Sequence, residues 1–314
     1  MKVGVINIAL ANPRGFCAGV ERAIIIVEEA LKKYGAPIYV RNEVVHNKYV
    51  INDLKQKGAI FVDDLHTIPS GSHIIFSAHG VSKAVRKSAD KLHLIPIDAT
   101  CPLVTKVHNE VNRFYEGQYH IFMIGHKGHP EVEGTMGQIE KNSPEASIHL
   151  IESIDDVEKL PNIDTDKISY VSQTTLSVDD TSIIIDALKS KFPNIKSPKN
   201  SDICYATQNR QDAVKGMLGN QDLIFVVGSN NSSNSSRLAE IAKQHNIEAI
   251  LIDDMKFFDP SILKNKKNIG ITAGASAPEI LVQQLIVEIN KYSDTVVSEI
   301  KGVEESVIFK LPII

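Results

Sequence analysis

Short apolar runs alternate along the chain with stretches in which apolar residues recur every three or four positions. The first pattern is typical of buried strands and the second of amphipathic helices. Strands are predicted over Val3–Ala9, Ile38–Val45, Ile74–Ala78, Leu94–Ile97, Ile121–Ile124, Ile168–Ser172, Leu223–Val227, Ala249–Ile252 and Ile269–Thr272. Helices are predicted over Lys48–Lys57, Asp179–Lys191, Ser236–His245 and Pro278–Lys291. This alternation of strand and helix predicts an α/β protein with mainly parallel sheets.

The three cysteines lie at one repeated point of this pattern. Cys17, Cys101 and Cys204 each follow a strand-like or irregular segment and directly precede a helical pattern. A thiol at a helix N-terminus meets unpaired N–H groups and the positive end of the helix dipole, so its metal-binding thiolate form is favoured. Any one of them alone is better explained as a small buried apolar residue. Three in the same position indicate a shared role.

The repeat of this position divides the chain into three similar α/β domains. They are predicted over residues 1–101, 102–200 and 201–291, followed by a C-terminal tail over 292–314 with a strand at Val307–Ile314. The N-terminal strand can join the third domain instead of the first. Packing of the three domains about a pseudo-threefold axis would bring the three thiols together at the centre.

Composition narrows the classes of protein to consider. The chain has 314 residues, of which 43% are hydrophobic and 23% charged, as in ordinary globular proteins. Its longest apolar runs, such as Ala23–Val27, are far short of the ~20 residues that cross a bilayer. Met1–Val5 lacks the features of a secretory leader, so we expect a cytoplasmic protein with no membrane contact. A net charge of −4 gives no electrostatic reason to bind nucleic acid.

The number and spacing of the cysteines limit what they can hold. An odd count argues against a disulfide framework, and the chain has no CxxC pair of the structural zinc kind. Soft thiolates select zinc, copper(I) or iron-sulfur clusters. A [4Fe-4S] cluster held by three cysteines leaves one iron open to a substrate. A zinc enzyme is the rival, because His129-Pro130-Glu131 matches half of a zinc deaminase signature, although its P-C-x-x-C half is absent.

Polar side chains gather just after several predicted strands, where open α/β sheets bind ligands. The run Ser229–Ser236 lies between a strand and a helix, so its hydroxyl and amide groups can form an anion site with the helix N–H groups. The same run can also be a plain flexible loop, and Ser276 can be a purely structural helix cap. The combined pattern predicts a small anionic, phosphorylated substrate.

At these residues the chain closely resembles the 4-hydroxy-3-methylbut-2-enyl diphosphate reductase family of the methylerythritol phosphate route to isoprenoids. The resemblance covers nearly the whole chain. The matching motifs are Asn12–Cys17, Glu43–Asn47, Ser77–Ser82, Asp98–Pro102, Gly128–Thr135, Gln173–Leu176, Asp202–Thr207, Asn231–Ser235 and Gly274–Pro278.

The resemblance implies a fold of three α/β domains arranged pseudo-threefold around a central [4Fe-4S] cluster held by Cys17, Cys101 and Cys204. It implies that Glu131 donates protons and that Thr174 lies close to the substrate hydroxyl. The residues that it assigns to substrate binding, chiefly to the diphosphate, are His46, His79, His129, Thr174, Ser232, Ser233, Asn234 and Ser276.

The reaction implied by the resemblance is the last step of the route. An allylic hydroxyl, bound to the open iron, leaves as water on arrival of two electrons and two protons, giving isopentenyl and dimethylallyl diphosphates. The implied electron donor is a ferredoxin or flavodoxin. Two alternatives stay open on the residues alone, a non-enzymatic iron-sulfur redox sensor and a zinc hydrolase. Glu131 on its own is equally explained as a helix-start carboxylate.

Overall fold

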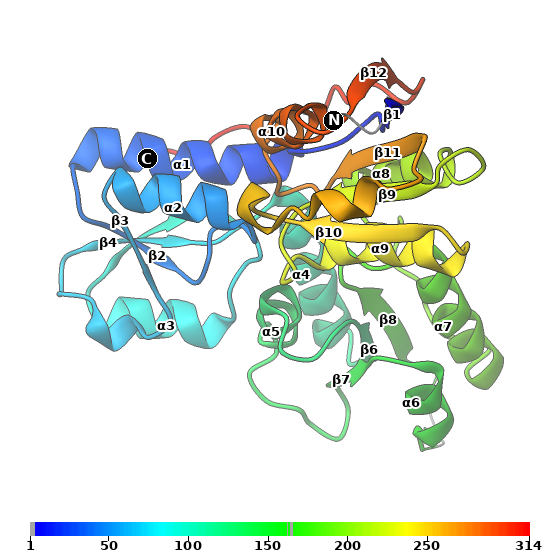
Figure 1. Ribbon diagram of the computed structural model, residues 1–314. Coiled ribbons are helices and arrows are strands. Elements are labelled where there is room, and N and C mark those ends of the chain that lie inside the picture. Colours follow the sequence, from blue (N-terminus) through cyan, green and yellow to red (C-terminus); the bar gives the residue numbers. More distant parts are fainter. Residues whose placement is uncertain (1–3, 162, 164–165) are drawn as a thin grey trace. The chain divides into compact units, whose positions relative to one another are not determined.

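The computed structural model describes residues 4–161, 163 and 166–314 and has the predicted α/β architecture (Figure 1). Its named strands form three sheets, and every strand pair within them is parallel. The prediction of a mainly parallel α/β protein is therefore confirmed. The chain divides into two compact units, of which the first runs through Glu21 and resumes over His46–Asp53 and Tyr205–Ile308. The second unit comprises Arg22–Val45, Leu54–Cys204 and Phe309–Ile314.

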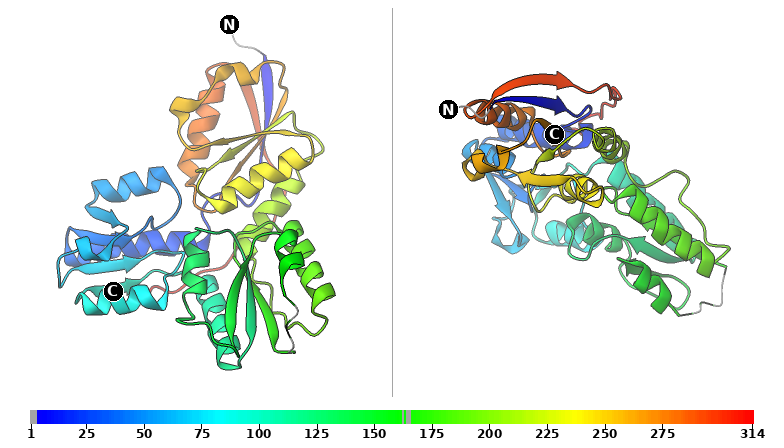
Figure 2. Two further views of the ribbon diagram at one scale, coloured as in Figure 1. Left: turned by 90° about the horizontal axis from the view of Figure 1, so that it is seen from below. Right: turned by 45° about the vertical axis from the view of Figure 1, so that its right-hand side comes forward.

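The first unit is built on a five-stranded sheet with the strand order β10-β9-β11-β1-β12. Consecutive residues of its central strands point to opposite faces. Phe225 packs in one apolar cluster with Leu285 of α10, and Ile224 packs in another with Leu238 of α9, so the two helices cover opposite faces of the sheet (Figure 2). The elements are β1 (Val5–Leu10), β9 (Leu223–Val227), β10 (Glu248–Ile252), β11 (Asn268–Ala273), β12 (Asp294–Glu299), α8 (Tyr205–Lys215), α9 (Ser233–Gln244) and α10 (Glu279–Asn290).

The second unit contains the other two sheets, with strand orders β3-β2-β4-β5 and β7-β6-β8. Its strands are β2 (Ile38–Arg41), β3 (Ala59–Val62), β4 (His73–Phe76), β5 (Ile95–Asp98), β6 (His120–Ile124), β7 (Ser147–Ile151) and β8 (Ile168–Ser172). Its helices are α3 (Lys83–Lys91), α4 (Pro102–Glu116), α5 (Pro130–Met136), α6 (Ile154–Lys159) and α7 (Val178–Lys191). Two further helices, α1 (Ala18–Tyr34) and α2 (Lys48–Gln56), have residues in both units.

The expected position of the cysteines is confirmed at all three helix starts. Helix α1 begins at the residue after Cys17, and α8 begins at the residue after Cys204. Cys101 is the N-cap of α4, and Pro102 occupies the first turn, where a missing N–H costs no hydrogen bond. Each thiol is thus carried at the positive end of a helix.

Some elements differ from the prediction. Strand β2 ends at Arg41, before the predicted end at Val45. The strand predicted over Val307–Ile314 is wrong, because this segment has no helix or strand and side chains such as Ile308, 90% exposed, have no sheet to pack on. Val3, where the first strand was predicted to begin, lies outside the described residues. Within the described chain, no helix is both long and apolar enough to cross a bilayer.

Candidate functional site

A buried carboxyl group, that of Glu131, is bound twice by one threonine in the second unit. Glu131 lies in the first turn of α5 and is 2% exposed. Its Oε1 accepts a hydrogen bond from the backbone N–H of Thr174 at 2.6 Å, and its Oε2 accepts one from Thr174 Oγ1 at 3.0 Å. Thr174 follows β8 and is 4% exposed. The structure therefore brings together the two residues expected to act on the substrate hydroxyl.

The protonation of Glu131 is shifted by its surroundings. Burial raises the pKa of Glu131 to about 7, because an ionised carboxylate loses its hydration. The two hydrogen bonds from Thr174 oppose this shift by stabilising the carboxylate, and the nearby negative charge of Asp202 adds to it. A carboxyl group with a pKa near neutrality carries a proton in a large fraction of molecules at physiological pH, as a general acid requires.

Two of the predicted substrate histidines lie side by side in the same unit. The rings of His79 and His129 meet edge to face with centroids 5.8 Å apart. His129 is the N-cap of α5, and its Nδ1 accepts a hydrogen bond from the backbone N–H of Glu131 at 3.2 Å. The ring proton of a neutral His129 is therefore on Nε2, which makes Nε2 a hydrogen-bond donor. Both histidines are half-buried.

Small residues set the distance between the histidine-bearing segments. A Cβ on Gly134 of α5 would lie 3.2 Å from the backbone of Gly80, so α5 contacts the loop after His79 at backbone distance. Gln138, 6% exposed, donates from Nε2 to the carbonyls of Val81 at 3.0 Å and Gly134 at 2.7 Å. This buried hydrogen-bonded contact holds α5 and the loop in one arrangement.

Cys101 and Cys204, in the same unit, are each joined by backbone to this group of residues. The N–H of Cys101 donates to the carbonyl of Ala78, next to His79, at 3.0 Å. The N–H of Cys204 donates to the carbonyl of Thr174 at 3.1 Å. Each of the two thiol-bearing segments is therefore hydrogen-bonded to a segment that carries a predicted substrate residue.

Cys17 has the corresponding contact in the first unit. Its N–H donates to the carbonyl of Ala275, next to Ser276, at 3.2 Å. Gly15, two residues before it, has φ +70° and a N–H bonded to the carbonyl of Ala273 at 3.0 Å. A Cβ on Gly15 would also lie 3.1 Å from the carbonyl oxygen of Ala277, so both its conformation and its contact favour glycine.

The remaining predicted substrate residues gather at the start of α9 in the first unit. Ser232 is the N-cap of this helix, and its Oγ accepts a hydrogen bond from the N–H of Ser235 at 3.3 Å. Ser276 Oγ lies 3.4 Å from Ser232 Oγ and donates to the carbonyl of His46 at 2.9 Å. Ser233 is the first residue of the helix and is half-buried. Hydroxyl groups and a helix N-terminus are thereby placed together.

A buried amide donor with no partner in the described part of the chain lies at the start of α9. Asn234 is 3% exposed, and its Oδ1 accepts the backbone N–H of Ala275 at 2.9 Å. Its Nδ2 is buried and has no hydrogen-bond partner among the described residues. A buried polar atom without a partner is costly, and an anion at the helix start would satisfy it.

Close packing around Ser235 keeps the site narrow. A Cβ on Gly228, after β9, or on Gly274, after β11, would overlap the Ser235 hydroxyl. Both strand ends therefore leave room for the Ser235 side chain only because they carry glycine. Ser235, fully buried, was not predicted as a site residue, although it lies within the Asn231–Ser235 motif.

Asp202 is a second buried carboxylate that the sequence analysis did not assign. It is 5% exposed, and its Oδ2 accepts the backbone N–H of Ser172 at 3.0 Å. Burial raises the pKa of Asp202 to about 6, while the bond from Ser172 and the charge of Lys106 oppose the rise. Its position two residues before Cys204, inside a motif, was the available signal.

The cysteines suit a metal cofactor in chemistry and exposure. None of the three is joined in a disulfide, and each is partly exposed. In neither unit taken by itself, over the residues described, do three His, Cys, Asp or Glu side chains form a ready metal-binding group. Cys17 belongs to the first unit and the other two cysteines to the second.

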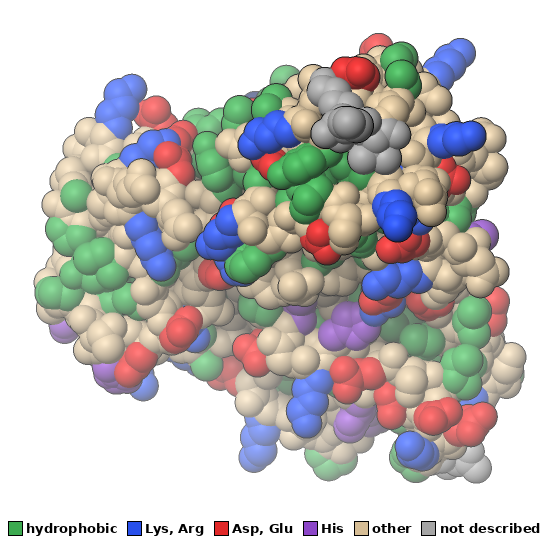
Figure 3. Space-filling view, viewed as in Figure 1, with side chains coloured by type: hydrophobic (Ala, Val, Ile, Leu, Met, Phe, Trp, Pro, Cys, Tyr) green, Lys and Arg blue, Asp and Glu red, His purple; other side chains and the backbone are tan. Residues whose placement is uncertain are grey.

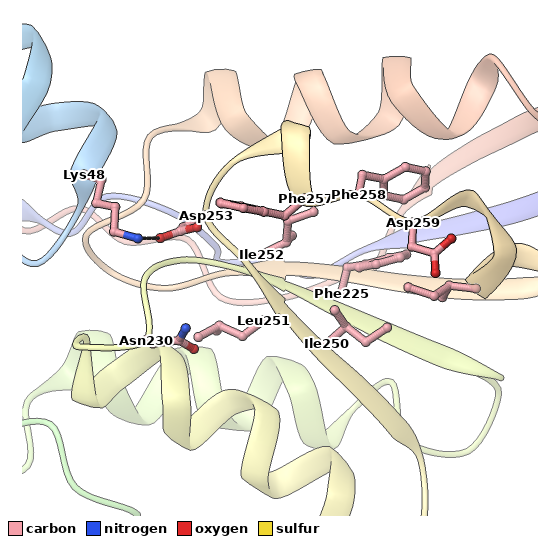
Figure 4. A pocket seen from close by; sticks show the side chains of 11 residues that line it. Lys48, Phe225, Asn230, Ile250, Leu251, Ile252, Asp253, Phe257, Phe258 and Asp259 are labelled. Atoms are coloured by element: carbon pink, nitrogen blue, oxygen red, sulfur yellow. Dashed lines mark ion pairs between the residues drawn. The ribbon is translucent and has the colours of Figure 1, made fainter.

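A separate cavity of about 340 Å³ lies in the first unit (Figure 4). Its lining combines apolar side chains, among them Phe225, Phe257 and Phe258 beside β10, with polar and charged ones. The ion pair of Lys48 with Asp253, 2.8 Å long, lies at one end. None of its lining residues is a predicted site residue.

Charges of both signs are mixed over the surface seen in Figure 3. The chain carries 34 Lys and Arg against 38 Asp and Glu, so neither sign dominates.

Comparison with known proteins agrees with the geometry. A family model described as LytB protein matches residues 8–290. The chain is 58% identical over 306 residues to a 4-hydroxy-3-methylbut-2-enyl diphosphate reductase of Azoarcus sp. strain BH72, covering 98% of this chain and 96% of that protein. It is 55% identical over 314 residues to the enzyme of the same name from Nitrosomonas europaea, covering 98% of this chain and 97% of that protein.

Solved structures give the same match. The E-1-hydroxy-2-methyl-but-2-enyl-4-diphosphate reductase of Plasmodium falciparum superposes with a TM-score of 0.91 at 41% identity, covering 99% of this chain and 96% of that one. A second structure, of an (E)-4-hydroxy-3-methyl-but-2-enyl diphosphate reductase, gives a TM-score of 0.65 at 29% identity, covering 91% of this chain and 99% of that one.

Proposed function

Because the chain belongs to the LytB family of reductases, we propose that it converts (E)-4-hydroxy-3-methylbut-2-enyl diphosphate to isopentenyl and dimethylallyl diphosphates. It is an oxidoreductase, and one related structure is that of the terminal enzyme of the non-mevalonate pathway. In the proposed reaction the allylic carbon–oxygen bond breaks, two electrons and two protons are consumed, and the oxygen leaves as water.

We assign Cys17, Cys101 and Cys204 as ligands of a [4Fe-4S] cluster. Three thiols, each at a helix start and outside any disulfide, match the donor set of such a cluster with one iron left open. When bound, the cluster supplies the electrons and a Lewis-acidic iron for the substrate oxygen. A ferredoxin or flavodoxin is the proposed electron donor, and the cytoplasmic location stays a prediction.

The start of α9 is the proposed diphosphate site. Asn234 Nδ2 offers a buried donor, and the hydroxyl groups of Ser232, Ser233 and Ser276 offer further ones. The positive end of the helix favours the anion. His46, whose carbonyl accepts from Ser276, is assigned to the same group. Binding at the diphosphate supplies energy remote from the reacting carbon and holds the substrate in register.

Glu131 is the proposed proton donor to the substrate hydroxyl. A hydroxide ion leaves poorly, whereas a protonated hydroxyl leaves as water, so an acid near the oxygen accelerates cleavage. The Thr174 hydroxyl, bonded to Glu131 Oε2, is placed to orient the substrate hydroxyl or to pass the proton. We assign His79 and His129 to substrate binding as well, His129 through its Nε2 donor.

The observation that carries this proposal is the buried Glu131 carboxyl with a pKa of about 7, hydrogen-bonded to Thr174. A structural carboxylate at a helix start would be exposed and ionised, and a sensor that only holds a cluster has no need of a buried acid. The geometry therefore favours an enzyme.

The direct test is anaerobic turnover of the allylic diphosphate with an artificial reductant, followed by identification of the products. We expect isopentenyl and dimethylallyl diphosphates, formed in amounts that follow the reductant consumed. The unphosphorylated alcohol serves as the matched control and should react poorly, because it lacks the anchoring group. Consumption of reductant without loss of the substrate hydroxyl would contradict the proposal.

A further inference from the structure

Three basic side chains form the same kind of contact, one on each helix that begins after a cysteine. Arg22 lies on α1, Lys106 on α4 and Arg210 on α8. Each donates to backbone carbonyls that lie just before a cysteine, and in each case that cysteine is not the one at the start of its own helix. We call these three residues the loop-holding cations.

Arg22, on the helix after Cys17, holds the backbone before Cys101. Its Nη1 donates to the carbonyls of Ala99 at 3.3 Å and Thr100 at 3.1 Å. Its Nε donates to the carbonyl of Lys310 in the C-terminal tail at 2.8 Å. The guanidinium thus has two sets of acceptors, one in front of a cysteine and one in the tail.

Lys106, on the helix after Cys101, holds the backbone before Cys204. Its Nζ donates to the carbonyls of Asn200 at 3.2 Å and Ser201 at 2.9 Å. The same ammonium pairs with Asp202 Oδ1 at 3.3 Å. The buried carboxylate left unassigned by the sequence analysis is therefore the counter-ion of this contact.

Arg210, on the helix after Cys204, holds the backbone before Cys17. Its side chain is 1% exposed, and its Nη2 donates to the carbonyls of Gly15 at 2.8 Å and Phe16 at 3.1 Å. Its counter-ion is Glu305 in the C-terminal tail, with Nη1 and Oε1 2.9 Å apart. A guanidinium so deeply buried requires a counter-ion, so the tail is part of this contact.

The tail follows the Cys17 segment over several residues before it reaches Arg210. The N–H of Ile300 donates to the carbonyl of Leu10 at 2.9 Å. Gly302 contacts the backbone of Asn12 so closely that a Cβ there would overlap the Asn12 carbonyl. The predicted strand at Val307–Ile314 is thus replaced by an irregular segment that is fixed through its contacts.

We propose that Arg22, Lys106 and Arg210 are positioning residues, each of which fixes the backbone before the next cysteine in cyclic order along the chain. The helix after Cys17 holds the backbone before Cys101, and the helix after Cys101 holds the backbone before Cys204. The helix after Cys204 holds the backbone before Cys17. A ligand set drawn from three distant segments is disordered unless each segment is held, and these contacts hold the cysteine loops before a cofactor binds. This inference rests on the proposed function only in taking the three thiols as ligands of one cluster.

The test is the alkylation rate of each cysteine in the full chain after its iron is removed with a chelator, measured peptide by peptide by mass spectrometry. Loss of a charge-assisted contact should loosen one loop and speed alkylation of one cysteine by about tenfold. Arg22→Met should act on Cys101 and Lys106→Met on Cys204. Lys32→Met is the control, because Lys32 lies on α1 with its side chain 78% exposed and should change no rate.

Because Arg210 is fully buried, its contact is tested by a change in its counter-ion, Glu305. Glu305→Gln keeps the side-chain shape and removes its charge, and it should speed alkylation of Cys17 alone. Glu304→Gln, at the exposed neighbouring position, is its control. Removal of residues 305–314 should speed alkylation of Cys17 and Cys101 but not of Cys204, because Arg210 and Arg22 bond to the tail whereas Lys106 bonds to Asn200, Ser201 and Asp202.

The pattern of rates decides the proposal. If Arg22→Met sped only Cys17, the cysteine of its own helix, or if a variant sped all three thiols equally, the cyclic assignment would be wrong. Unchanged rates would overturn it as well. Iron content of the anaerobically purified wild-type chain is measured in parallel, and absence of iron would contradict the proposed function while the rates still decide the positioning role.

Discussion

The carboxyl group of Glu131 is hydrogen-bonded through both of its oxygens to Thr174, to the backbone N–H at 2.6 Å and to Oγ1 at 3.0 Å. Glu131 comes from the first turn of α5 and Thr174 from the segment after β8. The backbone bond fixes the acid in place, and the hydroxyl bond connects it to a group that can exchange a proton. The pair therefore joins the proposed acid and the proposed proton relay in one unit of the chain.

Replacement of Glu131 by Gln should lower turnover by roughly 10²- to 10⁴-fold, the usual contribution of a positioned general acid. The amide keeps the size of the side chain but cannot release a proton. Initial rates under anaerobic conditions at saturating substrate measure the change. Glu133→Gln, on the exposed face of the same helix, is the matched control and should retain the wild-type rate. Full turnover of the Glu131 variant would remove the acid role.

The rate should depend on pH through the ionisation of Glu131. Its pKa is about 7, so the protonated form predominates below that pH and disappears above it. We expect kcat to fall as pH rises through about 7. The profile is measured with a reductant whose potential is checked at each pH. In Glu131→Gln the residual rate should show no such fall, and a fall that persists would point to another group.

The same ionisation should appear in stability. The folded-state pKa of Glu131 is raised above the value of 4.5 for a free side chain, so its contribution to stability is complete below pH 4.5 and is lost as pH rises through about 7. The free energy of unfolding of the wild type should therefore fall from pH 5 to pH 8 by more than that of Glu131→Gln, and the extra fall should be at most about 3 kcal/mol. Urea unfolding of both chains at the two pH values measures it. An equal difference at both values would show that Glu131 does not titrate in this range.

Asn234 offers a sharp test of the diphosphate site. Asn234→Asp keeps the oxygen that accepts the N–H of Ala275 and replaces the unpartnered amide with a negatively charged oxygen. Repulsion of the diphosphate should raise KM by about 10- to 100-fold. Steady-state kinetics give KM and kcat separately. Asn230→Asp, at an exposed position of the same loop, should have a much smaller effect, and equal effects of the two changes would place the anion elsewhere.

Local patterns predicted the elements that are buried on both faces. Strand β9 has the predicted bounds, Leu223–Val227, because a run of five apolar residues between turn residues is typical of a fully buried strand. The helix starts after the three cysteines were also predictable, since capping and 3/4 periodicity are local properties. Strands β3 and β7 were missed because they mix exposed and buried positions without a regular alternation. Strand β12 was missed because none of its residues is buried.

The site was predictable as a set of residues but not as a geometry. Motif resemblance named Glu131 and Thr174, yet their hydrogen bonds join positions 43 residues apart and depend on tertiary packing. Arg210 gave no signal, because an arginine in a polar helix is usually exposed and only the fold shows that its side chain is 1% exposed. The sequence also does not show that Glu305, 95 residues away, is the counter-ion of Arg210.

The central claim is that three cysteines from distant segments hold one iron-sulfur cluster. The most direct measurement is the content of iron and acid-labile sulfide in the anaerobically purified chain, compared with that of Cys17→Ser, Cys101→Ser and Cys204→Ser. We predict about four iron and four sulfide per chain in the wild type, and loss of the cluster together with turnover in each variant. Stoichiometric zinc without iron, or full iron content in all three variants, would contradict the claim.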